Sequence, residues 1–278
     1  VGLEDTLDTC GTGGSGMSTI NTSTMCAFVL ASAGVRVAKH GNRSSSGKCG
    51  SADVLERLGV HLAATPEVAV RLLESVGMTF LYAPSYHPAM RHVMPVRRTI
   101  GFRTVFNFLG PLCNPARTRR QVIGVSDPRM ADLMAHALAE LGCERALVAH
   151  GEDGLDELTI CAPTQLWMVS DGEVTGATMR PEDAGLKRAE PAAIQGGSVE
   201  ENAAAFEAIL TGAEKGPRAD HVLLNAGAGL YIGDAANAIE EGVELARKQV
   251  ESGAAWAKFC AYRDATVAFA GSTQQAAG

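Results

Sequence analysis

Two features that mark nucleic-acid-binding and membrane proteins are missing from this 278-residue chain. Lys and Arg number 24 against 31 Asp and Glu, so the formal net charge is −7. A nucleic-acid-binding protein needs a basic surface to neutralise phosphates, whereas the densest basic segment here, 117–120, is a short stretch typical of an exposed turn. No run of 18 apolar residues occurs. We therefore expect neither nucleic acid nor a membrane as a partner.

Paired cysteines and abundant aromatic residues are also missing. The seven cysteines are odd in number and form no CxxC pair, which argues against both a disulfide framework and a zinc site. Reduced thiols fit the cytoplasm, or an organelle stroma if a transit peptide is missing. The chain starts at Val1 without Met and shows no signal peptide, so we expect an N-terminal segment to be missing. Aromatics make up 5% while glycines number 31, which favours an α/β layer fold.

The apolar pattern predicts a large α/β domain whose central sheet is mainly parallel and flanked by helices. A βαβ unit over 121–148 supplies a parallel pair with a right-handed crossover. Other strands are expected at 6–10, 35–38, 79–83 and, as an antiparallel meander, at 159–161, 165–170 and 174–179. Helices are expected at 23–33 (capped by Thr22 or Ser23), 51–58, 66–76, 87–99, 105–109, 128–141, 199–210, 220–230, 234–249 and 254–270.

A glycine-rich turn, 11–14 (GTGG), follows the first expected strand. Glycines let backbone N–H groups approach an anion without a Cβ in the way. The segment 21–24 (NTST) then places hydroxyls and an amide at a helix N-terminus, where the helix dipole favours phosphate. An ordinary strand-to-helix turn with an ordinary cap is the alternative interpretation.

The segment 39–47 (KHGNRSSSG) is more specific, because it combines cations, hydroxyls and glycines at the end of a strand. Lys39 offers a point charge for phosphate, Asn42 a donor and an acceptor, and Ser46 a hydroxyl. His40 is expected beside the bound ligands. The alternative is a solvated basic loop.

Two neighbouring carboxylates, Asp156 and Glu157, follow the strand that ends near His150. Mg²⁺ is held by one or two carboxylates together with ligand phosphates, so a Mg²⁺ site is expected here; a solvated acidic turn is the alternative. Arg97 and Arg98 lie on a basic helix. The arginine fork binds carboxylates bidentately, so these residues are candidates for a substrate carboxylate, against a simple charged surface helix.

Taken in order, several motifs resemble those of the anthranilate phosphoribosyltransferase family. They are GTGG, NTST, KHGNR, GSADVLE (50–56), HPA (87–89), VRR (96–98), RTVFNFLGPL (103–112) and GLDE (154–157). The resemblance implies transfer of phosphoribosyl from 5-phosphoribosyl diphosphate to the amine of anthranilate, with Mg²⁺, in tryptophan biosynthesis. It also implies a homodimer and an association with, or fusion to, anthranilate synthase. The α/β domain would comprise 1–85 and 113–278, and 86–112 would belong to a small helical domain.

The resemblance also assigns roles to individual residues. Lys39, Asn42 and Arg97 would be the catalytic set. Anthranilate would lie against Gly11, His40, Asn42, His87 and Arg97, with Arg97 binding its carboxylate. Phosphoribosyl diphosphate would contact Gly11, Gly14, Ser15, Thr19, Asn21, Ser23, Thr24, Lys39, Gly41, Asn42, Arg43, Ser46, Gly47 and Ser51. Ser23, Asp156 and Glu157 would hold Mg²⁺.

Two departures from the family pattern stand out. Ser15 replaces the usual Asp after GTGG, so we expect a weaker or altered Mg²⁺ dependence. The helices that usually precede GTGG are also missing, from which we expect poor solubility or a lost dimer. Two other functions remain open: a pyrimidine nucleoside phosphorylase, and a non-catalytic relative that binds nucleic acid.

Overall fold

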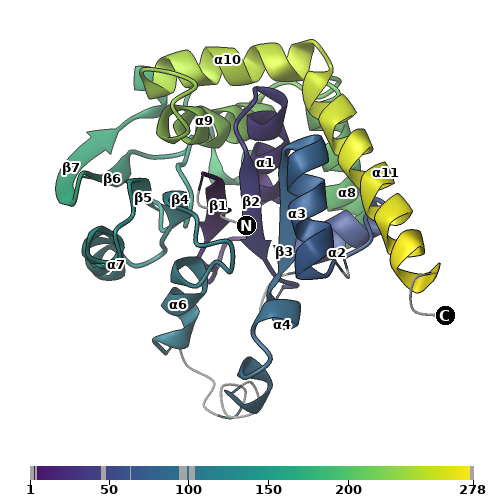
Figure 1. The fold of residues 1–278 in the computed structure, drawn as a ribbon. Helices are drawn as coiled ribbons and strands as arrows, with labels where there is room; N and C mark the ends of the chain where they lie inside the picture. Colours follow the sequence, from purple (N-terminus) through teal and green to yellow (C-terminus); the bar gives the residue numbers. More distant parts are fainter. Residues whose placement is uncertain are drawn as a thin grey trace.

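The computed structural model describes residues 3, 5–44, 48–62, 64–93, 99 and 104–275, and within them it contains one seven-stranded sheet (Figure 1). Its order is β3-β2-β1-β4-β5-β6-β7. The strands are β1 (Leu7–Gly11), β2 (Val37–Gly41), β3 (Met78–Tyr82), β4 (Arg120–Gly124), β5 (Arg145–Gly151), β6 (Thr164–Ser170) and β7 (Glu173–Met179). The first five are parallel, and β6 and β7 are added antiparallel. The predicted fold class is confirmed.

Helices flank this sheet, as the sequence predicts. They are α1 (Thr22–Ser32), α2 (Ser51–Arg57), α3 (Pro66–Val76), α4 (Ala83–Tyr86), α6 (Phe106–Leu112), α7 (Pro128–Glu140), α8 (Val199–Leu210), α9 (Pro217–Ile232), α10 (Ile239–Glu251) and α11 (Ala254–Gln275), with short 3₁₀ turns η1 (Pro181–Ala184) and η2 (Pro191–Ile194). In Figure 1, α10 crosses the top and α11 descends along the right side to the C-terminus. Among the described residues, no helix is both long and apolar enough to cross a bilayer.

Alternation along the strands divides the core into two main layers. Val122 belongs to the core cluster that contains the buried side chains of α1 and α9, whereas its neighbour Ile123 belongs to the cluster that contains those of α7. Leu147 and Val148 repeat the same division on β5. Both faces of the parallel strands are therefore covered, which is the usual environment of a parallel sheet.

The few aromatic residues gather where α1, α8 and α11 meet. The Phe28 ring lies 5.9 Å from Phe206, 5.2 Å from Phe259 and 5.6 Å from Tyr262, centroid to centroid, in edge or tilted contacts. Such pairs stabilise a core beyond the apolar area that they bury. This cluster fixes α1, whose N-terminus faces the candidate site, against the C-terminal helix.

The predicted strand at 159–161 is wrong. Thr159 Oγ1 donates to Asp153 Oδ2 at 2.7 Å and accepts from the Cys161 amide at 2.9 Å, and the Thr159 amide donates to Thr164 Oγ1 at 3.1 Å. These side-chain hydrogen bonds take backbone groups that a strand would use. The segment therefore forms a fixed loop beyond β5.

Three predicted helix ends also differ from the structure. Gly110 and Pro111 do not end the helix that we expected at 105–109; they lie inside α6. The helix expected from Asp234 begins at Ile239, because Asp234 has a left-handed φ of 58°. The N-cap of α1 is Asn21 rather than Thr22 or Ser23. Of the helix expected at 87–99, residues 90–93 are helical and 94–98 lie outside the described residues.

The Tyr262 hydroxyl provides a test of how α11 is held. It accepts a hydrogen bond of 3.0 Å from the backbone amide of Phe80 on β3, and both residues are buried. Tyr262→Phe leaves that amide unpaired, so the free energy of unfolding should fall by about 1–3 kcal/mol. Urea denaturation measures the change. Tyr231→Phe on α9 is the matched control, and an equal loss in both variants would contradict this role.

Candidate functional site

The candidate site lies at the carboxyl edge of the parallel strands, where ligands of open α/β sheets bind. The GTGG turn leaves β1, the KHGN segment ends β2, and the loop 151–158 leaves β5, as the sequence predicts. This loop lies against the end of β4: a Cβ built on Gly124 would collide with the backbone carbonyl of Asp156. The absence of a side chain at Gly124 thus lets the two carboxylates reach the ends of β1 and β4.

Lys39 is the most unusual residue of the site, because its side chain is only 1% exposed. Its ammonium donates to the Thr9 carbonyl at 2.5 Å and to Ser23 Oγ at 3.1 Å. Ser23 lies in the first turn of α1. A buried charge persists only where hydrogen bonds or opposite charges compensate it, so this ammonium is held in a fixed position below the helix N-terminus.

The GTGG turn is bound directly to the acidic loop. The Gly13 amide donates to Asp156 Oδ2 at 2.7 Å, and Gly13 and Gly14 have positive φ angles of 72° and 78°. Burial, and secondly the neighbouring Glu157, raise the pKa of Asp156; hydrogen bonds from Gly13 and Ser15 act in the opposite direction. Two like charges held together in this way are stabilised by a cation.

A small cavity of about 10 Å³ joins the predicted metal ligands. Ser23, Asp156 and Glu157 line it together with Thr9 and Asn225. Its oxygen ligands are those that Mg²⁺ prefers, and two carboxylates suffice when ligand phosphates complete the coordination. In the described part of the chain no group of three or more His, Cys, Asp or Glu could hold a metal alone. The residues present thus fit Mg²⁺ bound together with phosphates.

Other predicted phosphate contacts converge on the N-terminus of α1. Thr24 Oγ1 donates to Ser51 Oγ at 2.9 Å, which joins the first turns of α1 and α2. The Asn21 side chain donates to the Cys49 carbonyl at 3.3 Å and accepts from Asn202 of α8 at 3.0 Å. A free-standing solvated loop would lack these connections, so residues 49–51 are part of a built site together with the N-terminus of α1.

The other face of β2 carries the predicted aromatic side of the site. His40 Nε2 lies 3.2 Å from His87 Nε2, with the rings edge to face. Asp8 Oδ1 accepts from the His40 backbone amide at 3.0 Å, while Asn114 Nδ2 donates to Asp8 Oδ2 at 2.7 Å and to the Ala38 carbonyl at 2.8 Å. Burial raises the pKa of Asp8.

The remaining predicted residues are placed as follows. Gly11 faces Asp156, and a Cβ there would lie 2.5 Å from Asp156 Oδ2. Thr19 pairs with Gln195 in an isolated bridge. Gly41 ends β2, and Asn42 accepts from the Arg43 amide at 2.7 Å. The Arg43 guanidinium pairs with Asp53 and Glu56 of α2 at 2.9 and 2.8 Å. Ser46, Gly47, Arg97 and Arg98 lie outside the described residues.

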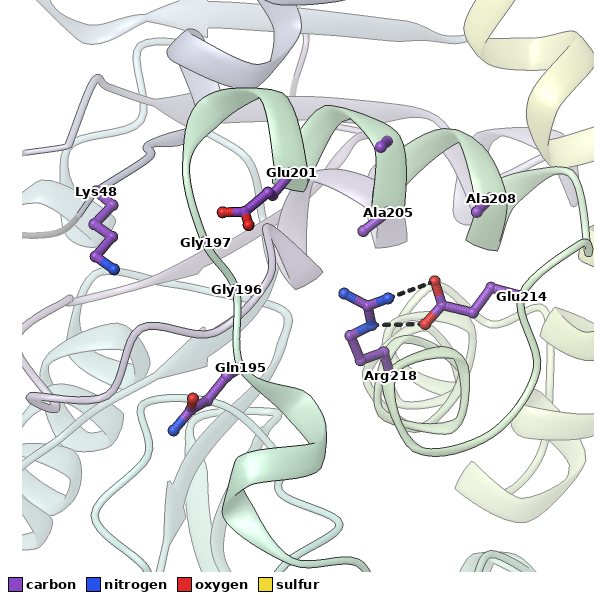
Figure 2. A pocket seen from close by; sticks show the side chains of 10 residues that line it. Lys48, Gln195, Gly196, Gly197, Glu201, Ala205, Ala208, Glu214 and Arg218 are labelled. Carbon is purple, nitrogen blue, oxygen red and sulfur yellow. Dashed lines mark hydrogen bonds and ion pairs between the residues drawn. The ribbon is translucent and has the colours of Figure 1, made fainter.

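A larger hollow of about 570 Å³ lies beside α8 and contains none of the predicted site residues (Figure 2). Lys48 stands across it from Glu201, and Ala205 and Ala208 of α8 form one wall. Its arginine, Arg218, is already neutralised by Glu214 at 2.6 and 2.9 Å. Because neither Lys39 nor the carboxylates of Asp156 and Glu157 line it, this hollow is separate from the cluster that those residues form.

The sequence is similar to that of a known enzyme family. Residues 3–256 match the model of the glycosyl transferase family a/b domain. Anthranilate phosphoribosyltransferase of Symbiobacterium thermophilum is 53% identical over 249 residues, which are 90% of this chain and 73% of the relative. That of Synechococcus elongatus is 51% identical over 257 residues, covering 92% and 73%. The chain belongs to the anthranilate phosphoribosyltransferase family.

Solved structures of the family share the fold. The Thermus thermophilus enzyme superposes with a TM-score of 0.88 at 47% identity, over 94% of this chain and 78% of that one. The Saccharomyces cerevisiae enzyme in complex with PRPP and Mg superposes with a TM-score of 0.87 at 29% identity, over 94% and 74%. The family relationship that the motifs suggested is thus confirmed.

Several residues of the site were not predicted from the sequence. Asp8 is a carboxylate inside an expected strand, and a buried charge there requires a partner, which was the available signal. His221 and Asn225 are polar residues four positions apart on the apolar α9, so they share one face. His221 Nε2 lies 2.6 Å from Glu157 Oε2, and Asn225 bonds the backbone of Leu158. No nearby motif pointed to this contact across more than 60 residues.

The pair of histidines leads to a pH prediction. Burial, and secondly His87, lower the pKa of His40 from 6.5 to about 4. Between pH 6.5 and 4, His40 binds a proton more readily in the unfolded chain than in the folded one. The free energy of unfolding therefore falls as the pH drops through this window, by about 3 kcal/mol at its lower end. In His40→Gln this contribution is absent. Urea denaturation between pH 6.5 and 4 should therefore show a shallower decline for the variant.

The control for this experiment is His136→Gln, which removes an exposed imidazole from α7. Its unfolding free energy should follow the parent at every pH. If the His40 variant also declined as steeply as the parent, the buried neutral imidazole would not be the source of the acid sensitivity.

Proposed function

We propose that the chain transfers the phosphoribosyl group of 5-phosphoribosyl diphosphate to the amine of anthranilate and releases diphosphate. The observation that carries this proposal is the cluster at the carboxyl edge of the sheet, where the buried Lys39 ammonium, Ser23 and the carboxylates of Asp156 and Glu157 meet. Membership of the anthranilate phosphoribosyltransferase family supports the choice of substrates.

The diphosphate belongs on the α1 side of the cluster. The first turn of α1 and the Lys39 ammonium present hydrogen-bond donors and positive charge there. Such donors stabilise the charge that develops on a leaving diphosphate, and because they are fixed beforehand they need no reorganisation during the reaction. Thr24, Ser51 and Asn21 stand around the same helix terminus.

Mg²⁺ belongs between Ser23, Asp156 and Glu157. The yeast relative was solved in complex with PRPP and Mg, and the oxygen-lined cavity described above fits that ion. When bound, the cation neutralises charge on the phosphate oxygens. The chain itself holds the carboxylates in place through Gly13 and α9.

Anthranilate belongs on the opposite side of β2, near His40 and His87. Arg97 would bind its carboxylate through the bidentate geometry of the guanidinium. His40, whose low pKa keeps the imidazole neutral, places no second cation beside the attacking amine. The aniline nitrogen is already neutral at pH 7, so it attacks C1′ of the ribose without a required general base, and most of the rate comes from alignment.

The segment 86–112 is proposed to belong to a small helical domain that covers this side, since α4 and α6 both lie beyond the carboxyl edge of the sheet (Figure 1). The homodimer and the association with anthranilate synthase stay predictions. The chain covers 73% of the length of the Symbiobacterium and Synechococcus relatives.

The two sides of the site predict two different kinetic defects. Lys39→Met removes the charge beside the leaving group and should lower kcat by roughly 100-fold or more. Arg97→Ala should chiefly raise the KM for anthranilate. Loss of anthranilate fluorescence, with phosphoribosyl diphosphate and Mg²⁺ present, measures both. Lys215→Met, which removes an exposed lysine between α8 and α9, is the control and should behave as the parent.

A parent protein that consumes no anthranilate in this assay would overturn the proposed function. Equal effects of Lys39→Met and Lys215→Met would refute the assignment of Lys39 alone. Melting temperatures measured on all four proteins separate a kinetic defect from lost folding.

Ser15 predicts an altered metal requirement. Its hydroxyl acts to lower the pKa of the Asp156 carboxyl, so Ser15→Asp adds a negative charge next to the proposed cation site. One added charge of this kind is worth roughly 1 kcal/mol, and the half-saturating Mg²⁺ concentration should fall by about fivefold. Ser15→Ala, which adds no charge, is the control. Identical Mg²⁺ activation curves for the Asp variant and the parent would contradict the prediction.

A further inference from the structure

Helix α9 contacts the acidic loop at two successive points. His221 Nε2 lies 2.6 Å from Glu157 Oε2, and one turn later Asn225 grips the next residue, Leu158. Asn225 Oδ1 accepts from the Leu158 amide at 3.0 Å, and its Nδ2 donates to the Leu158 carbonyl at 2.8 Å. The helix thus fixes both a backbone unit and the side chain that precedes it.

Burying the His221 imidazole beside Glu157 costs desolvation free energy. The side chain is 0% exposed, and Nδ1 has no hydrogen-bond partner within the described residues. A ring with its proton on Nε2 donates to Glu157 and leaves only a lone pair unpaired at Nδ1, whereas a proton on Nδ1 would leave a buried donor unpaired. Glu157 Oε2 is therefore the acceptor of the one hydrogen bond that this imidazole makes.

Among the described residues, the Glu157 carboxylate is bonded through Oε2, which leaves its other oxygen for a cation. The same carboxylate lines the small cavity with Ser23 and Asp156. Groups behind a metal ligand fix its rotamer, and their loss typically lowers metal affinity 10- to 100-fold. A glutamate that could rotate freely would lose conformational entropy when it binds a cation.

We infer that His221 is a positioning residue that holds Glu157 in the orientation that binds the divalent cation. The inference deepens the proposed function and rests on its metal site. His221 touches neither substrate nor cation; it acts through Glu157, while Asn225 fixes the backbone from the same face of α9.

The test uses Mn²⁺ as the probe at a fixed concentration of phosphoribosyl diphosphate, which supplies the phosphate ligands. Binding to the complete chain is followed by the loss of the Mn²⁺ electron paramagnetic resonance signal relative to the same mixture without protein. His221→Leu fills the buried space without a donor and should weaken Mn²⁺ binding at least tenfold. His221→Gln can place an amide N–H near the position of Nε2, and should stay within about threefold of the parent. The Mg²⁺ concentration for half-maximal transfer should change in the same order.

Two further variants make the result decisive. Leu230→Ala creates a cavity in the buried, distant end of α9, and should lower the melting temperature without changing Mn²⁺ affinity. Glu157→Gln should abolish saturable Mn²⁺ binding, which identifies the site that the signal reports.

Unchanged Mn²⁺ affinity in His221→Leu would overturn the positioning role, and so would an equal loss in His221→Gln or in Leu230→Ala. If these outcomes occurred while the parent still consumed anthranilate, the proposed function would stand and only this inference would fall. Absence of saturable Mn²⁺ binding by the parent, or binding unaffected by Glu157→Gln, would remove the metal site and the inference with it.

Discussion

The site depends on one buried positive charge. The Lys39 ammonium, on the middle residue of β2, donates hydrogen bonds to the Thr9 carbonyl and to Ser23, and nearly all of the residue's surface is removed from water. Because a buried ammonium is unfavourable without compensation, the surrounding structure has to supply oxygen atoms and negative charge. The carboxylates of Asp8, Asp156 and Glu157 all lie in this part of the molecule, and each is held by hydrogen bonds of its own.

Those features that are local in sequence could be predicted from the sequence. The βαβ unit around α7, the antiparallel pair β6 and β7, and the positions of GTGG and KHGN at strand ends follow from apolar spacing and from glycine, and the structure confirms them. The strand expected at 159–161 failed because its threonine hydroxyl and the nearby Asp153 compete for backbone hydrogen bonds. Apolar pattern alone does not detect that competition.

The contacts made by distant segments could not be predicted. Asp8 and Asn114 meet across more than 100 residues to fix the backbone of His40, and His221 reaches Glu157 from a mostly apolar helix more than 60 residues further along the chain. Such pairs arise because strand order in the sheet brings separate loops to one edge. The family motifs mark the residues that face ligands, whereas the residues behind them carry no local signature and depend on packing.

Alternation along β2 explains how one strand end can serve two unlike substrates. Lys39 points toward α1 and the cluster of Ser23, while its neighbour His40 points to the opposite face and His87. Successive residues of a strand face opposite sides of the sheet, so a charged leaving group and an aromatic acid can be bound only one residue apart without sharing an environment. On the proposed function, the two substrates then meet just beyond Gly41, where the strand ends and no side chain separates the faces. A side chain at this position is also excluded by packing, because a Cβ on Gly41 would collide with the Phe80 ring.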